Sequence, residues 1–180
     1  MSIEPGDEQE DDQGVWSLCG QLKHLSTGER AALRRMPLTK SFQTDGVVEK
    51  LLRRAGIMVD VDDDATFEMW RLLAHAAAVI AGTGGRMAHA GKRPLGRALH
   101  EVWLKSSTIN RLLTARGPAL LDQVRRIAVR LASGSDAIPA NMAELRDLAS
   151  PNVVAADRAR RSIARAYFAA EDKKNREKAK

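Results

Sequence analysis

Apolar residues along this chain recur at intervals of three and four, which is the period of an α-helix. The clearest apolar face belongs to a helix expected over 67–81 and consists of Phe67, Trp70, Ala74, Ala77 and Ala81. Strands require β-branched or aromatic residues at alternate positions, and no such run is longer than a few residues. The pattern therefore predicts an all-α fold.

Residues that cap or interrupt helices divide the first half of the chain into four helices. Ser26 or Thr27 can cap the second helix at its start, and Pro37 stops it. Gly56 can close the third helix as a left-handed cap. The helices expected from these signals span residues 15–25, 28–36, 47–55 and 67–81.

The second half of the chain predicts five further helices. Leu95, Leu99 and Trp103 lie on one apolar stripe, so the first of these helices is expected to include Trp103 in its buried face. Pro118 is typical of a first helical turn, and Asn152 can cap a long final helix. The expected helices span residues 95–103, 109–113, 118–131, 142–148 and 153–170.

The stretch "GTGGRMAHAGKRP" at 82–94 interrupts the helical pattern with four glycines and a proline. We interpret it as a flexible, basic loop that joins two small helical bundles, one over 14–81 and the other over 95–170. Charged segments at the two ends, 1–13 and 171–180, are expected to be disordered tails.

Composition and charge narrow the class of protein. With 44% hydrophobic and 29% charged residues, the chain is typical of a soluble globular protein, and no apolar run reaches the roughly 20 residues that a membrane span needs. The acidic N-terminus does not resemble a signal peptide, and the single cysteine, Cys19, is consistent with a reducing compartment, so a cytoplasmic location is expected. The net charge is +6, and because residues 1–13 hold acids and no base, the remainder is more basic still. Such a charge favours an anionic partner.

No catalytic motif is recognisable. The glycine-rich stretch departs from a Walker loop, because Arg86 stands where the first glycine is needed and Arg93 follows Lys92 in place of serine or threonine. The four histidines are widely spaced, and "DVDDD" at 60–64 lacks the glycine and the distal glutamate of a calcium loop. We therefore expect no enzymatic activity, no cofactor, no metal and no small-molecule substrate.

The arginines follow helical faces. Arg126 and Arg130 share one flank of the helix expected over 118–131, and Arg125 lies on the other. In the final helix Arg160 points into the apolar arc, which predicts a structural arginine paired with a carboxylate. Like charges at this density repel one another, so helix stability alone does not explain them. Few aromatic rings are left over for stacking bases, so the pattern favours a phosphate-gripping surface that does not read sequence.

Five motifs in this order resemble the small subunit of the type I-E CRISPR Cascade complex, the CasB family: "STGERAALRR", "PLGRAL", "RLLTAR", "LLDQVRRIAVRL" and "RARRSIARAYF". The resemblance spans roughly residues 14–170. It implies a helical, non-catalytic subunit that is present as two copies beside other Cascade subunits. Its basic surfaces would hold guide RNA and target DNA and would stabilise the displaced strand of the R-loop, while base pairing reads the sequence.

The candidate nucleic-acid-binding residues come from two sources. The resemblance places basic residues facing nucleic acid at Arg34, Arg35, Arg111, Arg116, Arg125 and Arg126. The charge pattern adds Lys92, Arg93, Arg97 and Arg130.

Two alternatives remain open at this point. The chain could be a free-standing helical DNA- or RNA-binding protein, which would bind without partners. It could also be an assembly adaptor whose arginines meet acidic protein surfaces, with no direct nucleic-acid contact.

Overall fold

The computed structural model describes residues 7–36, 42–133 and 137–178, and the elements in these ranges are helical. Extended backbone pairing there is limited to one isolated parallel bridge, between His89 and Ala140. The all-α prediction is confirmed. The elements in chain order are α1 (Asp7–Gln21), η1 (Leu22–His24), α2 (Thr27–Arg34), α3 (Phe42–Ala55), α4 (Asp64–Ala81), α5 (Leu95–Glu101), α6 (Ser106–Thr114), α7 (Gly117–Ala132), α8 (Met142–Leu148) and α9 (Val153–Lys178).

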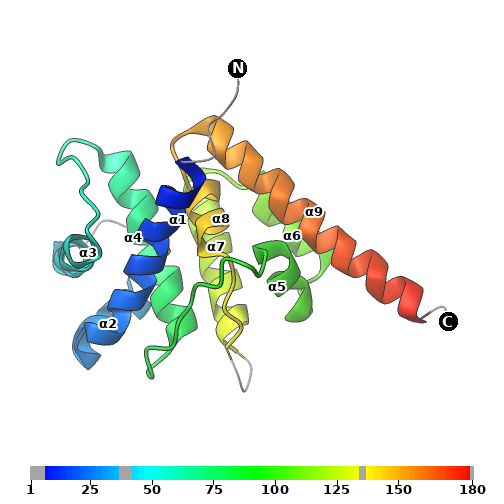
Figure 1. Ribbon diagram of the computed structural model, residues 1–180, viewed down its shortest axis with the longest axis horizontal. Coiled ribbons are helices and arrows are strands. Elements are labelled where there is room, and N and C mark those ends of the chain that lie inside the picture. The colour runs from blue at the N-terminus through cyan, green and yellow to red at the C-terminus, as the bar shows by residue number, and fades with distance from the viewer. Residues whose placement is uncertain (1–6, 37–41, 134–136, 179–180) are drawn as a thin grey trace.

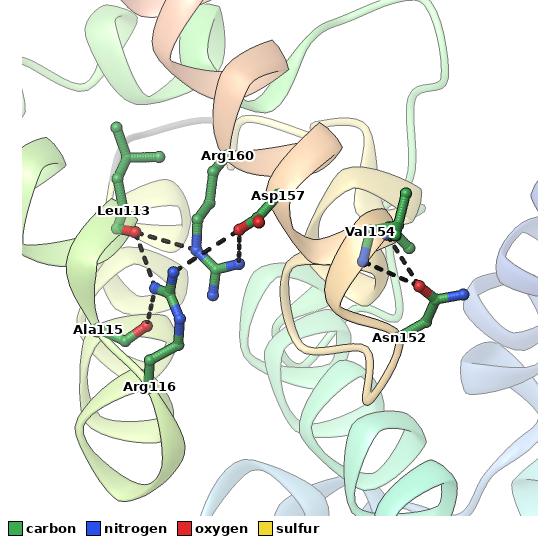
Figure 2. Close-up of polar contacts among 8 residues, drawn as sticks. Leu113, Ala115, Arg116, Asn152, Val154, Asp157 and Arg160 are labelled. Atoms are coloured by element: carbon green, nitrogen blue, oxygen red, sulfur yellow. Dashed lines mark hydrogen bonds and ion pairs between the residues drawn. The ribbon is translucent and has the colours of Figure 1, made fainter.

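Local capping sets several helix ends where the sequence predicts them. Ser26 caps α2 in a capping box: its Oγ accepts from the Glu29 N–H at 3.2 Å, and its own N–H donates to Glu29 Oε2 at 2.7 Å. Asn152 caps α9 by accepting from the backbone N–H groups of Val154 and Ala155 (Figure 2). Gly56 follows α3 with φ of +75°, a conformation that favours glycine.

Tertiary contacts move other helix ends away from their expected positions. α1 begins at Asp7, earlier than the expected residue 15, and Asp12 of this added part lies 3.2 Å from the ring of His89. α9 continues to Lys178, past the expected end at 170.

The expectation that Trp103 lies in the buried face of its helix is wrong. α5 ends at Glu101, and Trp103 has φ of +58° and is 72% exposed. The backbone leaves the helix because the N–H groups of Trp103 and Leu104 donate back to the carbonyls of His100 and Leu99, which turns the chain toward α6.

The helices of both halves share one cluster of buried apolar side chains. α4 packs along α7 near the centre of the molecule, and the long α9 packs against α5 and α8 on the side that leads to the C-terminus (Figure 1). Contacts of α4 with α7 and α8, and of α1 with α8, join the first half of the chain to the second. The division into two bundles stays a prediction.

The segment 82–94 runs from α4 to α5 and is anchored in its second part. Ala88 and His89 are buried, Ala90 N–H donates to the Ala140 carbonyl at 2.9 Å, and Ala140 N–H donates to the Ala88 carbonyl at 3.1 Å. The backbone of residues 88–90 is therefore tied to the residues that lead into α8.

α5 and α9 approach each other closely because Gly96 has no side chain. A Cβ at this position would lie 2.0 Å from the carbonyl oxygen of Ile163 and 2.8 Å from the backbone nitrogen of Tyr167. Glu144 of α8 holds the same pair of helices, since it accepts from the Leu95 N–H at 2.6 Å and from the Ser162 hydroxyl at 2.5 Å. These contacts fix the surface on which Trp103 lies.

Candidate nucleic-acid interface

The end of α2 and one flank of α7 bring three of the predicted residues to the same part of α4. His75 of α4 is buried, and its Nδ1 lies 2.8 Å from the Leu33 carbonyl, immediately before Arg34 and the exposed Arg35. Burial lowers the pKa of His75, the hydrogen bond to Leu33 opposes this, and the nearby charges of Arg125 and Arg71 lower the pKa further. Arg125 therefore lies near a buried histidine of α4 whose other contact is the end of α2, where Arg34 and Arg35 follow Leu33 in the chain.

The exposed faces of α6 and α7 present the next set of cations. Arg126 is bound to Asp122 of its own helix at 2.9 Å, so part of its charge is neutralised. Arg111 and Arg130 are exposed, and no carboxylate in the described part of the chain lies within ion-pair distance of either. These two arginines are available to an external anion.

The guanidinium of Arg116 is bound by other groups of the chain. Its Nη1 donates to the carbonyls of Leu113 and Ala115 at 3.1 and 2.9 Å, and its Nη2 lies 3.8 Å from Asp157 of α9. Figure 2 shows its guanidinium beside that of Arg160, which also donates to the Leu113 carbonyl and pairs with Asp157 at 3.1 Å. The structural role that the helical phase predicts for Arg160 is confirmed.

Arg160 lies close to a second cation, Arg116, and to one carboxylate, Asp157. Burial lowers the pKa of Arg160, and the charge of Arg116 lowers it further, while Asp157 opposes both effects. Two guanidiniums share one carboxylate at this junction, so the corner between the α6–α7 turn and α9 keeps a net positive charge.

A groove between α5 and α9 is lined by two of the predicted cations, the exposed Lys92 and Arg97. Arg97 contacts Glu101 of the groove at 3.2 Å, and Arg93 contacts the same carboxylate at 3.4 Å. α9 contributes two cations that the sequence reasoning missed, Lys173 and Lys174. The sequence assigned them to a disordered tail because no apolar residue follows Ala170 at helical spacing.

Trp103 is the other residue of this groove that the sequence reasoning missed. Lys174 Nζ lies 3.3 Å from the centroid of its ring, which is the geometry of a cation–π contact. The following "KSST" stretch signals the start of a new helix at Ser106, and this signal places Trp103 in a turn rather than on a helical stripe.

Other titratable groups belong to the core. Burial raises the pKa of the Cys19 thiol to about 12, which leaves it an unreactive core residue. His89 accepts from the Met142 N–H at 3.1 Å, and burial lowers its pKa despite the opposing effect of Asp12. Among the described residues no group of three histidine, cysteine or acidic side chains could hold a metal ion, and no helix is long and apolar enough to cross a membrane.

Comparison with known proteins gives one family. No curated protein and no solved structure matches the chain. The family model of CRISPR-associated protein Cse2 matches residues 29–168, which include most of the helices described above and all ten candidate residues. The chain therefore belongs to the Cse2 family, also called CasB, the small subunit of the type I-E CRISPR Cascade complex.

Proposed function

We propose that this Cascade subunit grips the phosphate backbone of guide, target and displaced strands without reading their sequence, and so stabilises the R-loop. The proposal includes a non-catalytic role, a second copy of the chain as a neighbour in the complex, and a cytoplasmic location. Family membership supports association with other Cascade subunits. The contact with nucleic acid is supported by the surface cations.

The observation that carries the proposal is the distribution of carboxylates around the arginines. Arg35, Arg111 and Arg130 are exposed, and within the part of the chain that the structure describes no acid neutralises them. Arg111 and Arg130 lie in the last turns of α6 and α7, where the helix dipole favours a cation by less than about 1 kcal/mol. This effect leaves their guanidinium donors without an acidic partner among the described residues, so an external anion is the partner that their charge favours. A phosphate backbone offers that anion at regular spacing.

The arginines differ in what they can contribute. Arg116 uses its donors on backbone carbonyls, and Arg93 and Arg97 share Glu101. These residues hold the elements of the surface together, in addition to contributing positive charge. Their removal would disturb the fold as well as binding, so they are poor choices for a first test.

The test is a salt titration of strand binding by the full chain. Fluorescence anisotropy is measured with two unrelated single strands, for the parent and for the triple variant Arg35→Ala, Arg111→Ala, Arg130→Ala. We expect the variant to bind both strands more weakly by the same factor. Each lost phosphate contact should reduce the slope of log K against log salt by roughly 0.7 to 0.9.

A control variant separates specific contacts from net charge. Lys23→Ala, Lys50→Ala, Arg53→Ala removes the same formal charge from exposed positions on η1 and α3. Because Lys50 pairs with Glu29 at 2.5 Å, circular dichroism first establishes that this variant is folded. We expect it to keep most of the parent's affinity. Equal losses in the two triple variants, or a loss confined to one strand sequence, would contradict the proposed surface. Loss of complex assembly with unchanged strand affinity would support the adaptor alternative.

A further inference from the structure

Trp103 presents an aromatic ring to solvent. It is 72% exposed, whereas Trp70 is 8% exposed and packs in the core. Lys174 Nζ covers one face of the Trp103 ring at 3.3 Å from its centroid. With one face backed by a cation, the exposed surface must come mainly from the other face and the ring edges. The side chain is a flat apolar platform on a basic part of the surface.

The platform is held in place by its neighbours. Trp103 has φ of +58°, a conformation that is unfavourable for a bulky residue and persists where surrounding contacts enforce it. The Trp103 N–H donates to the His100 carbonyl at 3.0 Å, and the next carbonyl, that of Leu104, accepts from the Tyr167 hydroxyl at 2.5 Å. Strained residues of this kind cluster at ligand-binding sites.

Two hollows border the ring. Each is lined by cations together with acids, Glu101 and Glu177 in the larger hollow and Glu171 in the smaller one. The larger one, about 850 Å³, lies between α5 and α9 and is lined by Lys92, Arg97 and Lys173. The smaller one, about 380 Å³, is lined by Lys105 and Ser106 at the start of α6. Lys174 borders both hollows.

The charges in these hollows are only partly neutralised. Arg97 shares Glu101 with Arg93, and Lys173 lies 3.9 Å from Glu177. Lys92 and Lys105 are exposed, and no carboxylate of the described residues pairs with either. A polyanion that crosses the ring from one hollow to the other would therefore meet an unpaired cation in each of them.

We propose that this groove binds an unpaired stretch of nucleic acid, with one base stacked on Trp103 and the flanking phosphates beside Lys92 and Lys105. The inference rests on the proposed function and adds to it a contact with a base, where the arginines contact only phosphate. Stacking on an aromatic ring tolerates any base, so the contact stays independent of sequence. Bases inside a duplex already stack on their neighbours, so the ring selects single strands.

A strand fits this surface better than a protein partner. Protein interfaces place an exposed tryptophan in an apolar, fully desolvated centre with charges at the rim. Here Lys174 lies directly over the ring, and Lys173 and Arg97 line the larger hollow beside it, so a charged group contacts the tryptophan itself. Alternating aromatic and cationic groups are the arrangement that single-strand grooves use.

The test compares two strands of equal length and charge, one with bases and one abasic throughout. Anisotropy is measured with the full chain for the parent, Trp103→Ala and Trp103→Phe. We expect Trp103→Ala to weaken binding of the base-bearing strand roughly 5- to 150-fold, the range that base–aromatic stacking supports. Binding of the abasic strand should not change, and Trp103→Phe should restore most of the affinity because it keeps a ring.

A second readout uses tryptophan fluorescence. The base-bearing strand should quench the parent, and the quenching should be largely lost in Trp103→Phe. Trp16→Phe is the matched control, because Trp16 is 53% exposed but lies outside the groove, with its ring against His89. That variant should keep the quenching.

The outcomes separate the inference from the proposed function. If Trp103→Ala binds both strands as the parent does, the stacking site is overturned while the phosphate-gripping function stands. If the parent binds neither strand, the proposed function fails and the inference fails with it. If Trp103→Ala binds strands normally but no longer joins the other Cascade subunits, the groove is a protein interface and the inference is overturned. Circular dichroism of each variant establishes that it is folded.

Discussion

At the scale of single residues, Trp103 combines backbone strain with side-chain exposure. A left-handed backbone costs an L-residue roughly 1–2 kcal/mol, because Cβ crowds the carbonyl oxygen that follows. The structure keeps this conformation at φ of +58° through the hydrogen bonds around His100 and Leu104. Glycine would adopt it without strain. Tryptophan at position 103 therefore lowers the free energy of unfolding through backbone strain, not through a defect in core packing.

This strain predicts an order of stability among variants that lack the ring. Trp103→Gly should be more stable than Trp103→Ala by about 1 kcal/mol, because both remove the indole and only glycine relieves the strain. Urea unfolding followed by circular dichroism measures the difference. If the alanine variant proves more stable, the turn has a different conformation in solution.

At the scale of elements, the packing of α5 on α9 depends on backbone contact. Gly96 lets the two helices approach until the Ile163 carbonyl would overlap a Cβ. Glu144 then ties the first residue of α5 to α8 and α9, and the Tyr167 hydroxyl of α9 holds Leu104 in the turn that follows α5. Because neither backbone can retreat as a side chain can, this position excludes every residue larger than glycine.

A pair of glycine substitutions tests this contact. Gly96→Ala should destabilise the protein by about 3 kcal/mol, the upper end of what overpacking usually costs. Gly46→Ala is the matched control: Gly46 lies in α3, where a Cβ would meet no neighbouring group within 4 Å, and alanine should stabilise that helix by up to about 1 kcal/mol. Thermal or urea unfolding measures both changes, and a Gly96→Ala variant as stable as the parent would contradict the close approach.

At the scale of the whole molecule, His89 joins three parts of the chain. Its Nδ1 accepts from the Met142 N–H at the start of α8, its Nε2 lies 3.2 Å from Asp12 of α1, and its backbone belongs to the segment between α4 and α5. The residue is 2% exposed, and burial holds its pKa below the ordinary 6.5. Protonation of this ring therefore opposes folding.

The position of His89 predicts how stability depends on pH. The unfolded chain takes up a proton near the ordinary pKa of 6.5 and the folded chain does so only at lower pH. Stability present above 6.5 is therefore lost progressively as the pH falls from 6.5 to the lower pKa of the folded chain. His89→Gln keeps an acceptor for Met142 and does not titrate. Its free energy of unfolding should fall less than that of the parent between about pH 7.5 and pH 5.5 in urea titrations. Some pH dependence should remain, because burial also lowers the pKa of His75. Parallel curves for parent and variant would show that His89 does not titrate with folding.

Features that depend on near neighbours in the chain could be predicted from the sequence. The helix caps at Ser26 and Asn152 and the buried pairing of Arg160 follow from residue type and helical phase. Six of the ten candidate cations could be selected from the family resemblance, and the other four from the charge pattern. Which of them pair with acids could not be predicted in full, because Arg116 meets Asp157 across a gap of many residues, whereas Arg126 meets Asp122 one turn away.

The sequence alone determined the helical fold class, the basic character and the family resemblance, because periodicity, charge and motif order are properties of the chain itself. Only the tertiary structure decided which cations remain unpaired, where α5 ends, and that α9 carries Lys173 and Lys174 to the groove beside Trp103. These outcomes depend on contacts between residues far apart in the chain. The close approach at Gly96 and the hydrogen bond of the Tyr167 hydroxyl bring α9 and the turn at Trp103 together. The local sequence pattern contains no information about the distance between these two segments.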